Sequence, residues 1–393
     1  MDLFTKCQKF LKAKELMANG FYPYFRPIEE SLATEVVIQG RKMIMIGSNN
    51  YLGLTHHPHV LEKVKKAVEK YGSGCTGSRF LNGTLDLHEE LETRLAKFMD
   101  REAVQTFSTG FQTNLGVIAT LVGKNDVIFC DRENHASILD ACRLSFGETR
   151  KFRHNDPADL ERLLGNCDDD CGKLIVLDGV FSMLGDVVRL PEIVKLARRY
   201  RARILVDDAH SIGVLGAHGR GTAEHFGLDD QVDLVMGTFS KSFASIGGFI
   251  AGSKDVIHYL RHHSRPLIFS ASIPPAAAAA VLAALDVIEA EPERRERLWQ
   301  ITRRMKESFD RLGFDTGKTE TPIIPLVVGD ELKTIAFCQA LFENGVFANP
   351  VIAPGVPPGK DLIRTSYMAT HTDAELDYVL GVAEKLGREF EMI

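Results

Sequence analysis

Short apolar runs rich in β-branched residues alternate with amphipathic stretches through the middle of the chain. One such stretch, Leu190–Tyr200, predicts a helix. Successive strands about 30 residues apart with a helix between them are typical of right-handed βαβ crossovers. The pattern therefore predicts an α/β fold with a mostly parallel sheet covered by helices on both faces. The runs expected to form strands are Ala103–Phe107, Val127–Cys130, Leu174–Leu177, Ile204–Val206, Leu234–Met236 and Phe249–Ala251.

The pattern changes after Pro292. A charged helix is expected over Glu293–Leu312, followed by a strand over Ile323–Val328 and further short elements. This mixture is typical of a smaller α+β domain. The expected organisation is an N-terminal arm over residues 1–46, a large α/β domain over residues 47–288 and a C-terminal α+β domain over residues 289–393.

The charge distribution argues against a nucleic-acid partner, and the cysteine spacing argues against a zinc site. The net charge is -6, and basic residues are interleaved with acidic ones, as in Glu291–Arg303. No continuous positive face is expected, so nucleic acid is not an expected partner. The seven cysteines are spread along the chain, and Cys167 and Cys171 lack a second pair to complete a zinc site. We expect no metal, and reduced thiols in a cytoplasmic protein.

No segment predicts export or membrane insertion. Residues 1–14 alternate charged and apolar side chains and lack the apolar core of a signal peptide. The longest apolar run, Ile273–Leu285, is shorter than the roughly 20 residues that span a bilayer. Peripheral contact with the inner membrane stays open, because the amphipathic stretch Asp255–Arg265 can lie on lipid; a solvated helix face is the alternative.

Lys241 is the first candidate for chemistry. It follows the apolar run Val232–Met236 in the sequence Gly237–Ser242, and a lysine there is well placed to hold an aldehyde cofactor. A lone lysine in a Ser/Thr loop is usually only a solvated charge. The assignment therefore depends on partners elsewhere in the chain.

Asp207 and His210 supply two such partners. They directly follow the strand Ile204–Val206, and ligands of parallel sheets bind beyond the carboxyl ends of the strands. A carboxylate keeps the ring nitrogen of a pyridine-type cofactor protonated, and an imidazole can bind the phenolic oxygen of the same ring. Asp208 is expected to turn away as a structural partner. Acidic residues after a strand are also common helix caps, which is the alternative.

The segment Ser108–Gln112 is a candidate phosphate site. It lies between the strand Ala103–Phe107 and the apolar helix expected over Leu115–Leu121. Backbone N–H groups at a helix start bind anions, and the hydroxyls of Thr238 and Ser240 can add donors. An ordinary turn is the alternative, since Gly and Ser are common turn residues.

His135 follows the strand Val127–Cys130 and is expected at the same edge of the sheet. An imidazole there can stack on the face of a cofactor ring. A capping or loop histidine is the alternative.

Six ordered blocks of sequence carry a family resemblance. The blocks are Ser48–Leu54, Asn134–Ser137, Asp178–Met183, Val206–His210, Gly237–Lys241 and Ile363–Arg364. They resemble the α-oxoamine synthases, pyridoxal 5'-phosphate (PLP) enzymes of fold type I that condense an amino acid with an acyl-CoA. The resemblance covers nearly the whole chain.

The resemblance implies a role for each candidate. Lys241 holds PLP covalently and acts as a base, Asp207 pairs with the ring nitrogen, and His210 contacts the phenolic oxygen. His135 stacks on the ring. The other residues implied at the cofactor are Ser108, Gly110, Phe111, Ser182, Thr238, Ser240, Ser270 and Ala271.

The resemblance also implies a substrate site and a homodimer with shared active sites. Arg364 matches the arginine that grips the amino-acid carboxylate, a task suited to a planar fork. The alternative is a surface ion pair with Asp361 or Glu375. Asn50 and Tyr51 resemble further substrate contacts. The segment Phe269–Pro275 resembles the part that a neighbouring subunit contributes near the phosphate.

Within the family, three segments look most like bacterial members that use L-serine and palmitoyl-CoA. The implied products are 3-ketodihydrosphingosine, CoA and carbon dioxide, as in the first step of sphingolipid synthesis. The segments are Phe21–Pro27, Tyr71–Thr84 and Gly237–Gly248. Gly72–Gly77 also matches a dinucleotide-binding pattern, but the charged helix expected over Val64–Tyr71 replaces the strand that such a site requires.

Four alternatives remain open. The family includes 8-amino-7-oxononanoate synthase, which uses alanine, and enzymes that use glycine, such as 2-amino-3-ketobutyrate CoA ligase and 5-aminolevulinate synthase. The chain can also be a catalytically silent partner subunit, although Lys241, Asp207 and His210 are all present. A plain aminotransferase on the same fold is the last alternative.

Overall fold

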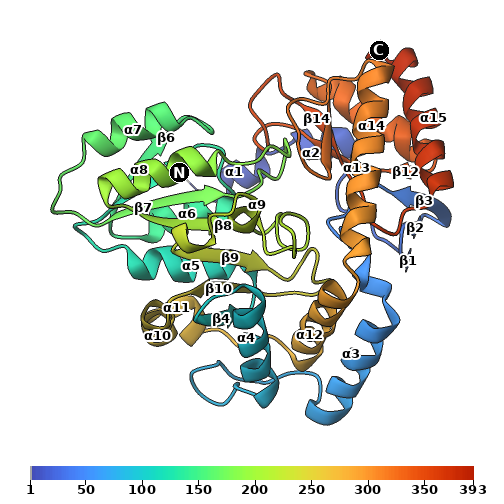
Figure 1. The fold of residues 1–393 in the computed structure, drawn as a ribbon. Coiled ribbons are helices and arrows are strands. Elements are labelled where there is room, and N and C mark those ends of the chain that lie inside the picture. The colour runs from blue at the N-terminus through green and yellow to red at the C-terminus, as the bar shows by residue number, and fades with distance from the viewer. Residues whose placement is uncertain (1) are drawn as a thin grey trace. The chain divides into compact units, whose positions relative to one another are not determined.

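The structure is a computed structural model that describes residues 2–393 (Figure 1). By its contacts the chain divides into two compact units. The large unit comprises residues 49–299, and the small unit joins residues 1–48 with residues 300–393. The N-terminal segment thus packs with the C-terminal part of the chain, a grouping that linear order does not suggest.

A seven-stranded sheet with the order β4-β10-β9-β8-β7-β5-β6 forms the centre of the large unit. Every strand but β10 runs parallel to the others. The predicted α/β fold and the predicted strands are therefore confirmed. The strands are β4 (Ala103–Phe107), β5 (Val127–Asp131), β6 (Glu148–Phe152), β7 (Lys173–Asp178), β8 (Arg203–Asp207), β9 (Leu234–Thr238) and β10 (Gly248–Gly252).

Two strands depart from the sequence pattern. β10 is antiparallel to both of its neighbours, because the connection over residues 239–247 is too short for a crossover, which needs about a dozen residues. The pattern does not predict β6, an edge strand in which Glu148 and Lys151 are exposed. The other strands are buried on both faces and therefore read as continuous apolar runs.

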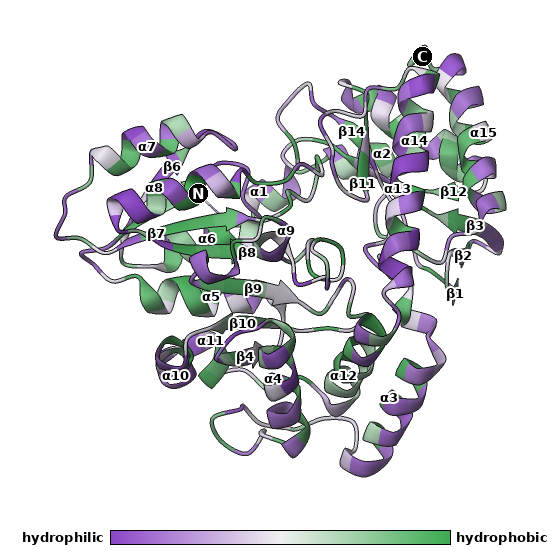
Figure 2. Cartoon of the chain, viewed as in Figure 1, coloured by the Kyte–Doolittle hydropathy of each residue, from purple (hydrophilic) through white to green (hydrophobic). Residues whose placement is uncertain are grey.

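Helices cover the sheet of the large unit (Figure 1). Figure 2 shows hydrophobic residues concentrated on β7, β8 and α5, whereas α3 is largely hydrophilic. Val117 and Ile118 of α5 are fully buried in the main core cluster of this unit. The helices are α3 (Pro58–Tyr71), α4 (Asp86–Phe98), α5 (Gly110–Leu121), α6 (Ala136–Leu144), α7 (Pro157–Gly165), α8 (Leu190–Tyr200), α9 (Thr222–His225), α10 (Lys254–His263), α11 (Arg265–Ile268) and α12 (Pro275–Ala290), with short 3-10 turns η1 (Leu54–His56) and η2 (Asp229–Gln231).

Two small sheets and five helices, one of them shared with the large unit, make up most of the small unit. Strand β12 pairs in parallel with β3, with Val346 opposite Ile44, and this pairing ties the N-terminal strands to the C-terminal part. Phe309 and Phe337 are fully buried in its core. Helix α13 spans Glu293–Leu312, as predicted, and the division into units falls within it, between residues 299 and 300. The remaining elements are α1 (Thr5–Gln8), α2 (Lys12–Ala18), β1 (Glu30–Leu32), β2 (Glu35–Ile38), β3 (Arg41–Met45), β11 (Ile323–Val327), α14 (Glu331–Glu343), β12 (Val346–Phe347), β13 (Asn349–Val351), β14 (Leu362–Ser366) and α15 (Asp373–Glu389).

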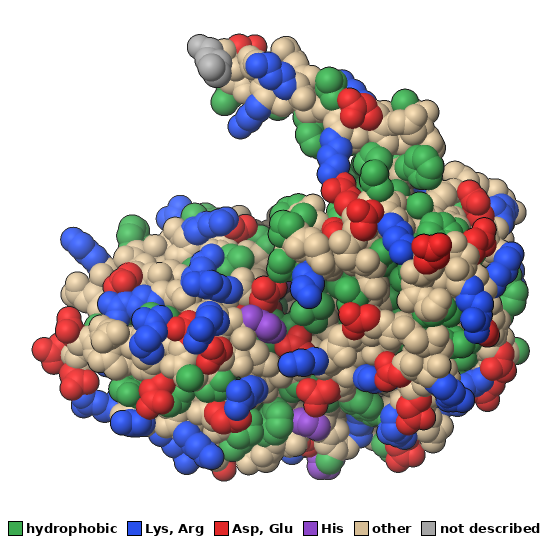
Figure 3. All heavy atoms as spheres, turned by 90° about the horizontal axis from the view of Figure 1, so that it is seen from above, with side chains coloured by type: hydrophobic (Ala, Val, Ile, Leu, Met, Phe, Trp, Pro, Cys, Tyr) green, Lys and Arg blue, Asp and Glu red, His purple; other side chains and the backbone are tan. Residues whose placement is uncertain are grey.

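The surface carries both signs of charge. On the face drawn in Figure 3, Lys and Arg side chains are interspersed with Asp and Glu. Within residues 2–393, no helix combines the length and the apolar character needed to cross a membrane.

Candidate active site

A cleft of about 320 Å³ lies at the carboxyl ends of the parallel strands of the large unit. Its lining includes His135 after β5, Asp178 at the end of β7, Asp207 at the end of β8 and Lys241 after β9. Parallel strands bring their carboxyl ends to one edge of the sheet. Side chains that are distant in sequence therefore meet in one cavity.

The turn after β9 sets the position of Lys241. The N–H of Phe239 donates to the carbonyl of Gly247 at 3.0 Å, and the Phe239 ring stacks on Phe249. Gly247 has a φ of +126°, and a Cβ atom there would lie 2.7 Å from the Phe239 ring. The turn therefore requires glycine at this position, and it leaves the Lys241 side chain half-buried among the residues that line the cleft.

Two carboxyl groups lie at the floor of the cleft. Asp207 accepts hydrogen bonds from the N–H of Ala209 at 3.0 Å and from the side chain of Asn114 at 2.7 Å. Asp178 accepts from the backbone N–H of His135 at 2.7 Å. Burial raises the pKa of Asp178 well above its usual range, and the charge of Asp207 raises it further. The raised pKa favours the neutral form of Asp178.

His210 is held by a tyrosine. Nδ1 of His210 lies 2.7 Å from the hydroxyl of Tyr51, which is almost completely buried. A buried tyrosine with a hydrogen-bonded hydroxyl is a rigid support. This contact fixes the imidazole beside the cleft.

His135 caps a helix and also lines the cleft. It is the N-cap of α6, because its Nδ1 accepts a hydrogen bond from the N–H of Ser137 at 3.3 Å. The same side chain lines the cleft and packs edge-on against Phe111. Burial lowers the pKa of His135 below its usual value; Asp207 opposes this shift and Lys241 adds to it.

Helix α5 begins at Gly110, five residues before the predicted start at Leu115. Thr109 caps this end through its hydroxyl, which accepts from the N–H of Gln112 at 3.1 Å. The hydroxyls of Thr238 and Ser240 lie 3.0 Å apart beside the cleft. A Cβ atom at Gly110 would lie 2.8 Å from the Thr238 hydroxyl, so only glycine fits. This end of the cleft is built to bind an anion.

The segment predicted to act across a subunit interface contacts residues around the start of α5 within one chain. The hydroxyl of Ser108 donates to the carbonyl of Ala271, and the Gln112 side chain donates to the hydroxyl of Ser270 at 3.0 Å. A role of Phe269–Pro275 in a neighbouring subunit stays a prediction.

The residues of the cleft fit PLP. Lys241 offers an amine for the aldehyde, Asp207 offers a negative charge for the ring nitrogen, and the start of α5 at Gly110 offers donors for the phosphate. Ser182 and Phe111 also line the cleft.

The predicted substrate residues are divided between the two units. Asn50 is buried in the large unit, where its side chain accepts from the N–H of Leu54 at 3.0 Å and donates to Thr55 at 2.9 Å. Arg364 belongs to the small unit. It lies on β14 with 6 % of its surface exposed and donates to the hydroxyl of Ser366 at 3.4 Å. Arg364 is thus not a surface residue.

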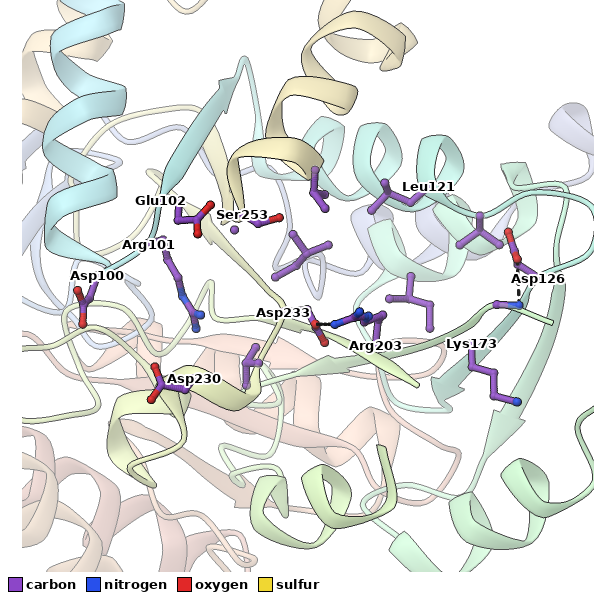
Figure 4. A pocket seen from close by; sticks show the side chains of 17 residues that line it. Asp100, Arg101, Glu102, Leu121, Asp126, Lys173, Arg203, Asp230, Asp233 and Ser253 are labelled. Atoms are coloured by element: carbon purple, nitrogen blue, oxygen red, sulfur yellow. Dashed lines mark hydrogen bonds and ion pairs between the residues drawn. The ribbon is translucent and has the colours of Figure 1, made fainter. Parts of the chain in front are cut away.

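A larger cavity of about 590 Å³ lies at the amino ends of the same strands (Figure 4). Its charged side chains mostly bind protein groups: Arg203 donates to Asp233 at 2.7 Å, and Asp126 accepts from the N–H of Gly172 at 3.2 Å. None of its lining residues belongs to the six family-like blocks. Within residues 2–393, no group of three or more potential ligands is arranged to hold a metal ion.

Ser137 and Asp178, which line the cleft, and Asn114, which is bonded to Asp207, were not identified as functional candidates from sequence. Asn114 has no exposed surface and lies on the apolar helix α5. A buried polar residue on a helix is costly without hydrogen bonds, but Asn114 precedes the helix predicted over Leu115–Leu121, so the sequence pattern did not place it on a buried face. Its contacts with Asp207 and Ser137 depend on tertiary structure.

Comparison with known proteins places this geometry in a family. The family model of class I and II aminotransferases matches residues 41–382. A serine palmitoyltransferase of Sphingobacterium spiritivorum is 51% identical over 389 residues, which cover 99% of this chain and 97% of the relative. An 8-amino-7-oxononanoate synthase of Thermoanaerobacter pseudethanolicus is 44% identical over 383 residues, with 97% of each chain covered.

The fold is also closely similar to that of a solved structure. A high-resolution structure of serine palmitoyltransferase with PLP superposes with a TM-score of 0.97 and 38% identity, with 100% of each chain covered. The chain belongs to the class I and II aminotransferase family, and within it to the PLP-dependent fold type I enzymes that include the serine palmitoyltransferases.

Proposed function

We propose that this enzyme catalyses the decarboxylating condensation of L-serine with palmitoyl-CoA, giving 3-ketodihydrosphingosine, CoA and carbon dioxide. The observation that carries the proposal is the single cleft in which Lys241, Asp207, His135 and His210 meet at the carboxyl edge of the sheet. The choice of serine and palmitoyl-CoA rests on the full-length similarity to serine palmitoyltransferases.

PLP, when bound, supplies an electron-withdrawing ring that stabilises negative charge on the amino-acid Cα. With PLP bound, Lys241 would hold the cofactor covalently through Nζ. The same amine, when not attached to the cofactor, can take the Cα proton of the amino acid because it lies within the cleft. Asp207 keeps a negative charge beside the ring nitrogen. The positive character of the ring therefore persists through the reaction.

The phosphate binds at the start of α5. Its donors are the backbone N–H groups near Gly110 and Phe111 and the hydroxyls of Thr238 and Ser240. Ser108, Ser270 and Ala271 shape this end of the cleft. His210, held by Tyr51, binds the phenolic oxygen, and His135 stacks on the ring, with Ser182 nearby.

Arg364 binds the carboxylate of serine. A guanidinium can bond both carboxylate oxygens and keeps its charge at any working pH. Asn50 is a second contact for the amino acid. Holding the carboxylate fixes the bond that breaks as carbon dioxide leaves, and release of this group makes the condensation irreversible.

We further propose a homodimer in which the segment Phe269–Pro275 of one subunit lies near the phosphate of the other. Exposed aromatic residues in this region support an interface: 75% of the Phe269 surface and 52% of the Phe80 surface are exposed in the single chain. A cytoplasmic location with peripheral contact to the inner membrane stays a prediction.

The second candidate function is that of 8-amino-7-oxononanoate synthase, favoured by the relative at 44% identity. The glycine-using siblings, a silent partner subunit and a plain aminotransferase have no specific support in the cleft.

Steady-state turnover of the PLP-loaded enzyme with serine, alanine and glycine tests the proposal. Each amino acid is paired with acyl-CoAs of short and long chain, and CoA release and carbon dioxide release are measured together. We expect turnover with serine and palmitoyl-CoA, with one carbon dioxide per CoA. Absence of product from this pair would refute the proposal, and turnover with alanine and pimeloyl-CoA would establish the second candidate.

A further inference from the structure

A continuous chain of hydrogen bonds connects Asp207 to His135 through two residues that have no role so far. Nδ2 of Asn114 lies 2.7 Å from Oδ2 of Asp207 and 2.9 Å from the hydroxyl oxygen of Ser137. That hydroxyl lies 2.8 Å from Nδ1 of His135. The chain joins the carboxylate proposed for the ring nitrogen to the imidazole proposed for the ring face.

The hydrogen bond between Asn114 and Asp207 has a defined direction. Asp207 carries the negative charge of the site and therefore accepts, so the amide group of Asn114 must face it with its N–H. The second N–H of the same amide donates to Ser137. Asn114 has no exposed surface, and 1 % of the Ser137 surface is exposed. Water therefore does not compete for these bonds.

The hydrogen bond between Ser137 and His135 determines which ring nitrogen of His135 carries the proton. Because the Ser137 hydroxyl accepts from Asn114, its own proton is free to bond Nδ1 of His135. The backbone N–H of Ser137, which can only donate, also points at Nδ1 at 3.3 Å. Nδ1 is therefore an acceptor, and a neutral ring must carry its proton on Nε2. Burial lowers the pKa of His135, which favours the neutral ring.

We propose that Asn114 and Ser137 are positioning residues for the reaction. Asn114 holds the carboxylate of Asp207 in one orientation, and Ser137 holds His135 in the neutral tautomer whose Nε2–H is offered to the cofactor and substrate. The inference deepens the proposed function and rests on it for the roles of Asp207 and His135. The hydrogen bonds themselves belong to the chain and exist without the cofactor.

Two variants test the hydrogen bonds of Asn114 and of Ser137 separately. Asn114→Leu keeps the approximate size of the side chain and removes both donors, while Ser137→Ala removes only the link to His135. Their matched controls are Thr113→Val, which removes a buried hydroxyl bonded to the carbonyl of Thr109 on the same helix, and Ser145→Ala at the other end of α6. Circular dichroism and thermal unfolding of the full chain identify any variant that fails to fold.

The tautomer of His135 is measured on the cofactor-free full-length protein with ¹⁵N-labelled histidine. The ¹⁵N resonances distinguish a protonated from an unprotonated ring nitrogen, and the spectrum of His135→Gln identifies the signals of His135. In wild type and Ser145→Ala we expect Nδ1 unprotonated. In Ser137→Ala we expect a mixture of both tautomers. An unchanged spectrum in Ser137→Ala would overturn the assignment of Ser137.

The orientation of Asp207 is measured on the PLP-loaded protein. In Asn114→Leu we expect a changed absorption spectrum of the bound cofactor, a shifted pH profile of kcat and a loss of about ten- to hundredfold in kcat/KM, the scale of one hydrogen bond to a charged group. Thr113→Val should match wild type in spectrum and pH profile.

The outcomes distinguish this inference from the proposed function. If Asn114→Leu folds and keeps the wild-type spectrum and pH profile, the role of Asn114 is refuted although the enzyme works as proposed. If Asn114→Leu does not fold, Ser137→Ala decides through the tautomer of His135. If wild-type protein binds no PLP, the proposed function fails, and the tautomer measurement still tests the hydrogen-bond chain.

Discussion

Asp178 and Asp207 are register partners at the carboxyl ends of β7 and β8. Both are buried, and Asp178 is hydrogen-bonded to the backbone of His135 while Asp207 is bonded to Asn114. Two adjacent buried carboxyl groups do not readily ionise together. Burial, followed by the charge of Asp207, raises the pKa of Asp178. The raised pKa therefore favours the neutral form of Asp178.

Replacing each of this pair with asparagine should have unequal effects. Asp178→Asn substitutes a neutral group for a neutral group, so kcat/KM should stay within about threefold of wild type. Asp207→Asn removes the charge beside the ring nitrogen and should lower kcat/KM by about 10²-fold or more. Steady-state kinetics of both PLP-loaded variants measures the difference. Equal losses in the two variants would contradict the assignment of the charge to Asp207.

Lys241→Ala should keep the fold and abolish turnover. The variant lacks both the covalent attachment and the base, so we expect a loss of at least about 10³-fold in kcat. Lys254→Ala, which changes an exposed lysine on α10, is the control and should match wild type. Circular dichroism checks the fold, and the absorption spectrum checks the attachment. Substantial turnover by Lys241→Ala would exclude it as the base.

Arg364→Lys should raise KM for the amino acid more than KM for the acyl-CoA. Lysine keeps the charge and loses the bidentate geometry, so KM for serine should rise about tenfold or more while KM for palmitoyl-CoA changes little. Arg388→Lys on α15 changes an exposed arginine and controls for the substitution itself. The proposal for Arg364 fails if both KM values rise equally.

His154 should make stability depend on pH. Its Nδ1 lies 3.1 Å from Asp131 and its Nε2 lies 2.9 Å from Asp186. Burial lowers the pKa of His154, but these two carboxylates outweigh burial and raise the pKa to about 10. Since this value lies above the usual one of about 6.5, the stabilisation is complete below about pH 6.5 and is lost as the pH rises through about 10.

Urea unfolding of wild type and His154→Gln at about pH 6 and about pH 10.5 measures this effect. At the lower pH we expect wild type to be more stable by on the order of 2 kcal/mol, and at the higher pH we expect a smaller difference. His258→Gln, an exposed histidine on α10, is the control. A difference that does not change with pH would show that His154 is not held in its charged form.

The predicted strands of the large unit were largely correct because these strands are buried on both faces. The run Leu174–Leu177, which lies within β7, contains only apolar residues, so the pattern identifies it as a buried strand. The pattern missed β6, where an edge strand carries Glu148 and Lys151. It predicted the strand at β10 but not its direction, which is set by the length of a loop. Periodicity reports burial along a segment and carries no information on strand direction.

Asp207, His210 and Lys241 were found because each lies at or just beyond the carboxyl end of a strand, and the topology of a parallel sheet brings such positions together. Asp178 at the end of β7 was nevertheless missed. Asn114 and Ser137 were missed because they lie on helices, and nothing local indicates which buried face of α5 meets the end of β8. The start of α5 at Gly110 was missed because its first turn is polar.

The sequence by itself determined the fold class, the approximate strand ends and the kinds of chemical group available at them, because burial along a segment follows from local composition and spacing. The tertiary structure decided that the N-terminal segment packs with the C-terminal part and that Asn114 donates to Asp207. It also decided that burial and the neighbouring Asp207 raise the pKa of Asp178. These features depend on distances between residues that are far apart in the chain, and hydrogen bonds and charge interactions act only at such short distances.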